Sequence, residues 1–172
     1  MPSRELILSK EEIAARVKEL GAAISRDYAD SCLILIGILN GAFVFLADLM
    51  RAIDLPVQVD FVRVASYGAR SSGGEIRFVK DIELSIAGKD VLLVEDIVDT
   101  GRTIAHLRDI LADHRPSSVR LCALIDKKER RQVAVTVDYV GFEVKQGFLV
   151  GYGLDFAEQH RHYPEIYHLR QE

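Results

Sequence analysis

The feature that most constrains the fold is the order in which strand-like and helical patterns alternate along the chain. Short apolar runs of strand length are separated by turns, loops and segments in which apolar residues recur at helical spacing. The strand-like runs are 32–39, 57–68, 91–96 and 117–125, and the helical patterns are 10–26, 42–54 and 103–114. Repeated β-α-β order favours an α/β fold with a doubly wound, mainly parallel sheet.

The rest of the chain is expected to extend this sheet and to cap it. Ser9 and Glu12 have the spacing of a capping box, which predicts that the first helix begins near residue 10. The further extended segments expected are 76–84, 135–144 and 147–156. A turn is predicted at 87–89, and the polar, aromatic C-terminal tail is interpreted as part of a cap.

Composition narrows the class of protein. The 172 residues are 49% hydrophobic and 28% charged, which is typical of one globular domain and not of a disordered chain. The net charge of −4 provides no chain-wide basic field for nucleic acid. Charges interrupt the first twelve residues, and no apolar run approaches the roughly 20 residues of a membrane helix, so a cytoplasmic protein without membrane contact is expected.

The cysteines and histidines indicate neither a disulfide scaffold nor a metal motif. Cys32 and Cys122 lie within apolar runs and are expected to be buried free thiols. Five histidines are present, and the spacing of His160 and His162 does not place them on one helical face.

The segment 91–103, VLLVEDIVDTGRT, carries the strongest chemical signal. A buried strand is followed by a short loop, Asp99 to Thr103, that opens a helix. Backbone N–H groups at a helix N-terminus attract anions, Gly101 permits close approach, and Thr100 and Thr103 add hydroxyls, so the loop could hold a phosphate. A plain helix N-cap formed by Thr100 or Thr103 is the alternative.

Acidic residues precede this loop. Glu95 and Asp96 end an apolar strand, where adjacent carboxylates are costly unless they meet cations, hydroxyls or water. Ribose hydroxyls or a magnesium ion would satisfy them, and Asp99 could exchange a proton beside the sugar. A solvated acidic loop is the alternative interpretation.

Together these segments resemble the type I phosphoribosyltransferase family. VLLVEDIVDTGRT is similar to the motif of that family that binds phosphoribosyl pyrophosphate. The blocks GILNGAFVFLADL, ASYG, LIDKK, VGFEV and GFLVGYGLD, with a following arginine, resemble the hypoxanthine-guanine branch and cover most of residues 33–161 in order. The resemblance implies one domain over 1–172, with a small hood built from the terminal segments, including about 145–172, and a flexible lid at about 66–80.

The resemblance also implies an activity. A phosphoribosyltransferase of this branch transfers the 5-phosphoribosyl group to N9 of hypoxanthine or guanine, releases pyrophosphate and forms inosine or guanosine monophosphate in purine salvage. It implies Mg²⁺ as cofactor and a homodimer or homotetramer as assembly. Hypoxanthine, guanine and xanthine cannot be ranked from the sequence.

Roles follow for the central motif. Asp99 is the implied catalytic acid/base near purine N7. The residues implied to bind the 5′-phosphate and the ribose are Glu95, Asp96, Asp99, Thr100, Gly101, Arg102 and Thr103. The implied metal ligands are Glu95, Asp96 and Asp155.

On the purine side, the resemblance implies that Lys127 donates to O6, Phe148 stacks on the base and the Leu149 backbone binds near position 2. Without the resemblance, Lys127 would be read as part of a solvated charge run and Phe148 as core. Asp126, next to Lys127, could tighten or misplace the lysine.

Pyrophosphate and lid contacts are implied elsewhere. Leu39, Asn40 and Gly41 match the pyrophosphate loop, although the family usually has a basic residue in place of Asn40, which puts pyrophosphate affinity in question. Arg161 matches an arginine that neutralises pyrophosphate. Ser66 and Tyr67 open the implied lid, for which a hairpin tip is the alternative.

The sequence disfavours three other classes of protein. A receiver domain shares an acidic strand end with LLVED, but its acidic pair would lie near the start of the domain, and a P-loop NTPase would need G-x-x-x-x-G-K-[ST], which is missing from this sequence. The remaining alternative is an RNA-binding transcription attenuator on the same fold that senses nucleotides. A net charge of −4 disfavours it.

Overall fold

A six-stranded sheet forms the centre of the molecule, as the alternating pattern predicts. The computed structural model describes residues 3–67 and 75–170. The strand order is β4-β3-β2-β5-β6-β7, and every neighbouring pair is parallel except β3 and β4. The strands are β2 (Leu33–Leu39), β3 (Val57–Tyr67), β4 (Glu75–Lys80), β5 (Asp90–Val98), β6 (Ser118–Asp126) and β7 (Tyr139–Glu143). The expected doubly wound α/β class is confirmed.

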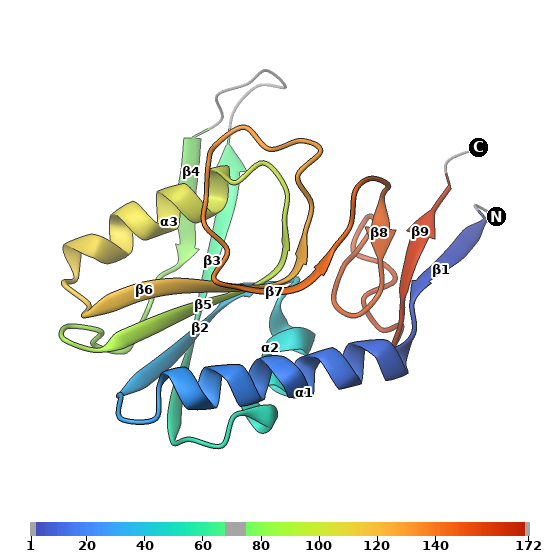
Figure 1. Cartoon of the computed structure of the whole chain (residues 1–172). Coiled ribbons are helices and arrows are strands. Elements are labelled where there is room, and N and C mark those ends of the chain that lie inside the picture. The colour runs from blue at the N-terminus through green and yellow to red at the C-terminus, as the bar shows by residue number, and fades with distance from the viewer. Residues whose placement is uncertain (1–2, 68–74, 171–172) are drawn as a thin grey trace.

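Helices cover both faces of this sheet (Figure 1). The helices are α1 (Lys10–Asp27), α2 (Phe43–Ala52) and α3 (Arg102–Asp113). Helix α1 begins where predicted, because the Ser9 hydroxyl accepts from the Glu12 N–H and the Glu12 carboxylate accepts from the Ser9 N–H. Its apolar stripe and that of α2 pack on one face, while Ile104, Leu107 and Leu111 of α3 pack on the other.

The two ends of the chain form a second, smaller sheet. Strands β1 (Arg4–Leu8), β9 (Ile166–Leu169) and β8 (Leu149–Val150) pair antiparallel in the order β1-β9-β8. This sheet stands beside the carboxyl ends of the central strands (Figure 1). It is the hood that the family resemblance implies, although the residue patterns did not predict β1 or β9 as strands.

The expectation of a strand over 147–156 was wrong for most of its length. Only Leu149–Val150 is a strand, because the next three residues have left-handed backbone angles, with φ of 102° at Gly151, 51° at Tyr152 and 97° at Gly153. Extended backbone requires negative φ, so the chain turns here. Likewise, 76–84 forms a strand only as far as Lys80.

The expected burial of both cysteines holds for one of them. Cys122 lies in the core on β6, whereas Cys32 precedes the first residue of β2 and is exposed, and both are free thiols. No helix among residues 3–67 and 75–170 is long and apolar enough to span a membrane.

Candidate active site

The loop between β5 and α3 forms a small hollow at the helix N-terminus. Gly101 is the N-cap residue with φ 83°, and because glycine has no side chain, it places no capping group over the first N–H groups of α3. The hollow measures about 110 Å³ and is lined by Glu95, Ile97, Val98, Asp99, Thr100, Gly101, Thr103 and Ile104. The Thr100 hydroxyl accepts a long 3.4 Å bond from the Arg102 N–H, which leaves its own proton available. This geometry favours a phosphate cradle over a closed N-cap.

Two buried carboxylates lie beside this hollow. Glu95 Oε1 accepts from the Asp96 N–H at 3.0 Å, and Asp96 Oδ1 accepts from the Ile97 N–H at 2.7 Å. Burial raises the pKa of Glu95 well above its ordinary range, and the adjacent Asp96 charge raises it further. Burial also raises the pKa of Asp96, although its hydrogen bonds and the charge of Arg161 act in the opposite direction. The pair is therefore poised for a cation or for hydroxyl donors.

The raised pKa of Glu95 has a consequence for stability. An acid whose pKa is higher in the folded than in the unfolded state weakens folding as pH rises above its ordinary value of 4.5. Glu95→Gln keeps an acceptor oxygen and removes the charge, so at pH 7 the ligand-free variant should melt about 2 °C or more above wild type. Calorimetry at pH 4.5 and 7 checks this; the gain should shrink at the lower pH, and an equal or lower Tm at pH 7 would contradict the buried-charge account.

The donor set at Glu95 and Asp96 suits magnesium. Mg²⁺ prefers oxygen ligands and is commonly held by one or two carboxylates, with substrate phosphates and water completing its coordination. No cluster of three or more metal-ligating side chains occurs in the described part of the chain. Asp155, the third predicted ligand, is paired instead with Arg161 at 3.0 Å, and its metal role stays a prediction.

Asp99 offers a carboxylate oxygen to the site. Its Oδ2 lies 3.3 Å from an exposed Arg130 nitrogen, whereas its Oδ1 is buried and has no hydrogen-bond partner. A buried acceptor without a partner costs free energy in the resting protein. A donor on a bound ligand, such as a ring N–H, would relieve that cost.

The base-side candidates differ in exposure. Lys127 follows β6 and is only 8% exposed, which rules out the solvated charge run for this residue; its Nζ lies 3.5 Å from Glu129 Oε2. Phe148 is 43% exposed and meets Phe156 edge to face at 5.5 Å, so it is not core. Leu149 is buried on β8, where its backbone pairs with β9.

Asp126 does not compete for Lys127. Its carboxylate pairs with Arg131 and, at 3.7 Å, with Lys128. The backbone N–H of Lys127 donates to Val98 O at 3.0 Å, and this bond joins the ends of β5 and β6. The Asp126 carboxylate is thus directed to Arg131 and Lys128, and no ion pair between Asp126 and Lys127 is seen in the described part of the chain.

The predicted pyrophosphate elements meet at one point. A Cβ on Gly41 would overlap the Asp96 carboxylate, and one on Gly153 would overlap Gly41 O, so these backbones pack directly against each other. Arg161 donates to Gly153 O at 2.7 Å. The Leu39-Asn40 peptide is cis. The loop after β2 therefore contacts both the acidic pair and the hood.

The predicted lid begins where β3 ends. The backbones of Ser66 and Tyr67 pair with Ile76 and Glu75 of β4. Residues 68–74 lie outside the described residues, so the lid at about 66–80 stays a prediction.

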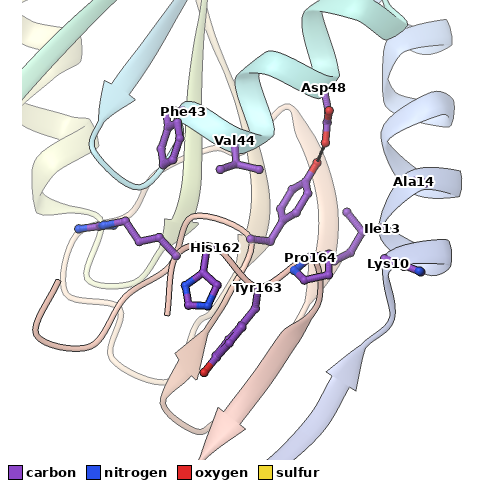
Figure 2. A pocket seen from close by; sticks show the side chains of 11 residues that line it. Lys10, Ile13, Ala14, Phe43, Val44, Asp48, His162, Tyr163 and Pro164 are labelled. Atoms are coloured by element: carbon purple, nitrogen blue, oxygen red, sulfur yellow. Dashed lines mark hydrogen bonds between the residues drawn. The ribbon is translucent and has the colours of Figure 1, made fainter. Parts of the chain in front are cut away.

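Sequence reasoning missed two groups of supporting contacts. Arg130 and Arg131, read as part of a charge run, reach Asp99 and Asp126. The Tyr152 hydroxyl donates to the Asp48 carboxylate, and both residues line a second hollow; Asp48 is labelled in Figure 2. In the sequence these arginines belong to the charged run KKERR, which does not show which of its side chains faces the site.

This second hollow is larger, about 570 Å³, and lies between α1, α2 and the segment before β9. Phe43 and Val44 from α2, Ile13 from α1 and Tyr163 from the C-terminal segment face it (Figure 2). It is mainly apolar and is not lined by the loop that follows β5, so the chemistry is placed at the smaller hollow instead.

Comparison with known proteins identifies the family. Residues 3–157 match the family model described as a phosphoribosyl transferase domain. The chain is 49% identical to a hypoxanthine-guanine phosphoribosyltransferase of Dictyostelium discoideum, over 99% of this chain and 97% of the relative. It is 48% identical to a protein of the same name from Aquifex aeolicus, over 95% and 93% of the two chains.

A solved structure has the same fold. The crystal structure of a hypoxanthine phosphoribosyltransferase from Staphylococcus aureus superposes with a TM-score of 0.93 at 40% identity, covering 96% of this chain and 91% of that chain.

Proposed function

The chain belongs to the phosphoribosyltransferase family, and we propose that it transfers the 5-phosphoribosyl group of phosphoribosyl pyrophosphate to N9 of hypoxanthine or guanine, as a purine salvage enzyme. The observation that carries the proposal is the open phosphate cradle at Gly101 directly beside the buried pair Glu95 and Asp96. The two features match the two ends of a ribose 5-phosphate: an anion and a pair of hydroxyls.

In this proposal the sugar phosphate lies along the loop after β5. The N–H groups at the start of α3 and the Thr100 and Thr103 hydroxyls hold the 5′-phosphate. Glu95 and Asp96 face the ribose hydroxyls, directly or through Mg²⁺. When bound, Mg²⁺ would neutralise pyrophosphate charge and orient the sugar.

The transfer needs one group on the protein that accepts the proton lost by the base. Asp99 accepts the proton from purine N7 as N9 attacks C1′; the C1′–N9 bond forms, and the bond from C1′ to the pyrophosphate oxygen breaks. The sugar is oxocarbenium-like between these events. The partnerless Asp99 Oδ1 supports this role. Arg161 and the backbone amides of the loop Leu39–Gly41 receive the departing pyrophosphate.

Base selection is assigned to the end of β6 and to the hood. The Lys127 ammonium donates to O6, Phe148 stacks on the ring, and the Leu149 backbone binds near position 2. A cationic donor favours a 6-oxo group over a 6-amino group, since an amino group at that position is itself a donor.

Replacing Lys127 by alanine should therefore weaken the binding of the purine base and leave the binding of phosphoribosyl pyrophosphate unchanged. Loss of a charged hydrogen bond raises the KM for hypoxanthine by about 10- to 100-fold, with the KM for phosphoribosyl pyrophosphate within about 3-fold of wild type. Steady-state kinetics with each substrate varied in turn measures the split. Lys128→Ala, which removes an exposed neighbour, is the matched control. Unchanged hypoxanthine KM in Lys127→Ala would remove the lysine from the base site.

A product analysis tests the function itself. Purified protein given hypoxanthine, phosphoribosyl pyrophosphate and Mg²⁺ should yield inosine monophosphate and pyrophosphate in equal amounts, separated by ion exchange and identified by mass. Pyrophosphate without nucleotide would indicate hydrolysis and would contradict the transfer.

The alternative of an RNA-binding regulator receives no support from the comparisons, because the relatives matched over almost the whole chain are named as enzymes. A homodimer or homotetramer is proposed, supported by apolar side chains that α2 leaves exposed, Phe43 at 46% and Met50 at 38%. The cytoplasmic location stays a prediction.

A further inference from the structure

The loop that would cradle the 5′-phosphate is itself held from behind. Three consecutive carbonyls, of the last residue of β5 and the first two residues of the loop, accept hydrogen bonds from one segment, 127–133. Val98 O accepts from the Lys127 N–H at 3.0 Å. Thr100 O accepts from the backbone N–H groups of Gln132 and Val133, at 2.9 and 3.0 Å. Between them, Asp99 O accepts from a side chain, Arg131 Nε, at 2.9 Å.

The direction of these carbonyls fixes the direction of the loop amides. In a planar trans peptide the C=O of one residue and the N–H of the next point in opposite directions. The N–H groups of Asp99, Thr100 and Gly101 therefore point away from the segment 127–133, and these three residues line the hollow at the start of α3. Whatever holds the carbonyls also aims the phosphate donors.

Arg131 is the side chain in this arrangement that links three elements at once. Its guanidinium donates to Asp99 O and, at 3.4 Å, to Val98 O, and it forms a close ion pair with Asp126 at the end of β6. The side chain is 17% exposed and Asp126 is 5% exposed, so water screens this contact only weakly. The loop is thus anchored to the sheet through a buried charge pair.

We propose that Arg131 is a positioning residue for the phosphate loop: it orients the amides of the loop for a 5′-phosphate without touching the substrate. The proposal rests on the proposed function, because the ligand of the loop is taken from it. Only a guanidinium has several donors in a fixed planar fork, and here they meet two carbonyls and a carboxylate. Lysine would keep the charge next to Asp126 but could not hold the same set of acceptors.

The test compares a nucleotide with its nucleoside. Inosine monophosphate carries the 5′-phosphate and inosine does not, so the ratio of their affinities measures how much the contacts to the 5′-phosphate contribute to binding. In Arg131→Lys the affinity for inosine monophosphate should fall about 10-fold or more, while that for inosine changes less than about 2-fold. Isothermal titration calorimetry with the full chain measures both constants.

A matched control separates positioning from general stability. Arg16 on α1 also donates to two backbone carbonyls, Gly141 O at 2.9 Å and Val140 O at 2.6 Å, but it holds β7. Arg16→Lys should lower the Tm without changing the nucleotide-to-nucleoside ratio. If the two variants alter that ratio equally, or if Arg131→Lys leaves it as in wild type, the proposal is overturned.

A second variant covers the case in which Arg131→Lys does not fold. Asp126→Asn removes the charge that anchors the guanidinium and should lower the nucleotide-to-nucleoside ratio in the same direction, by a smaller factor. An unchanged ratio in Asp126→Asn would also overturn the proposal. Failure of the proposed function has a separate signature: the wild-type protein would then bind inosine monophosphate no better than inosine.

Discussion

Asp99→Asn should lower kcat about 10²- to 10⁴-fold while leaving the binding of phosphoribosyl pyrophosphate within a few-fold of wild type. Asparagine has nearly the same shape and can still pair with Arg130, but it cannot take a proton from the purine. The Oδ1 atom of Asp99 is the buried acceptor without a partner, so the position is built for a donor that arrives with the substrate. Single-turnover measurement of inosine monophosphate formation, with substrate binding measured separately, isolates the chemical step.

Asp109→Asn is the appropriate control, because Asp109 is an exposed carboxylate on α3 and its neutralisation should leave kcat unchanged. Full activity in Asp99→Asn would eliminate the acid/base role. A loss of kcat accompanied by an equal loss of phosphoribosyl pyrophosphate affinity would assign Asp99 to binding instead.

Gly101→Ala should lower kcat/KM for phosphoribosyl pyrophosphate about 30-fold or more. The residue has φ 83°, where a side chain costs about 1–2 kcal/mol. Its new Cβ would also lie 2.5 Å from Val133 O and 3.2 Å from Arg131 Cδ, both in the segment that holds the loop. Relieving that overlap requires the loop to move, and about 2 kcal/mol of lost phosphate binding corresponds to the stated factor.

Gly88→Ala is a matched control for the cost of placing a side chain on left-handed backbone. Gly88 has φ 69°, and a Cβ there would meet no atom within 4 Å. The control should lose some stability to the left-handed conformation and keep its kinetic constants. Equal kinetics in the two alanine variants would show that the crowded side of Gly101 is unimportant for the phosphate site.

The middle of the central sheet was predictable because β2 and β5 are buried along most of their length and are followed by helices with a clear apolar stripe. β2 and residues 91–94 of β5 read as continuous apolar runs, and α1 begins at a complete capping box. The hood was not predictable from patterns, since β1 is largely exposed and β9 has only four residues, and each is stabilised by pairing across the whole length of the chain. Such pairing leaves no local periodicity to detect.

The candidate site was predictable where the chemistry is local in sequence. Glu95, Asp96 and the loop through Thr103 lie close together in the sequence, and Glu95, Asp99, Thr100, Gly101 and Thr103 line one hollow in the structure. Contacts made across the fold were not foreseen: Arg131 on Asp99 O, Tyr152 on Asp48 and Gly153 against Gly41. Arginine in a charged run usually remains in solvent, so its partial burial here depends on the tertiary position of Asp126.

The measurement that tests the account most directly is an ultraviolet assay of the purified protein with phosphoribosyl pyrophosphate and Mg²⁺. Hypoxanthine, guanine, xanthine, adenine and uracil are offered separately, each with and without a chelator. Chelator-sensitive nucleotide formation is expected from hypoxanthine or guanine, and none is expected from adenine or uracil. Turnover of adenine or uracil in preference to the 6-oxopurines, or no turnover of any base by folded protein, would contradict the proposed function.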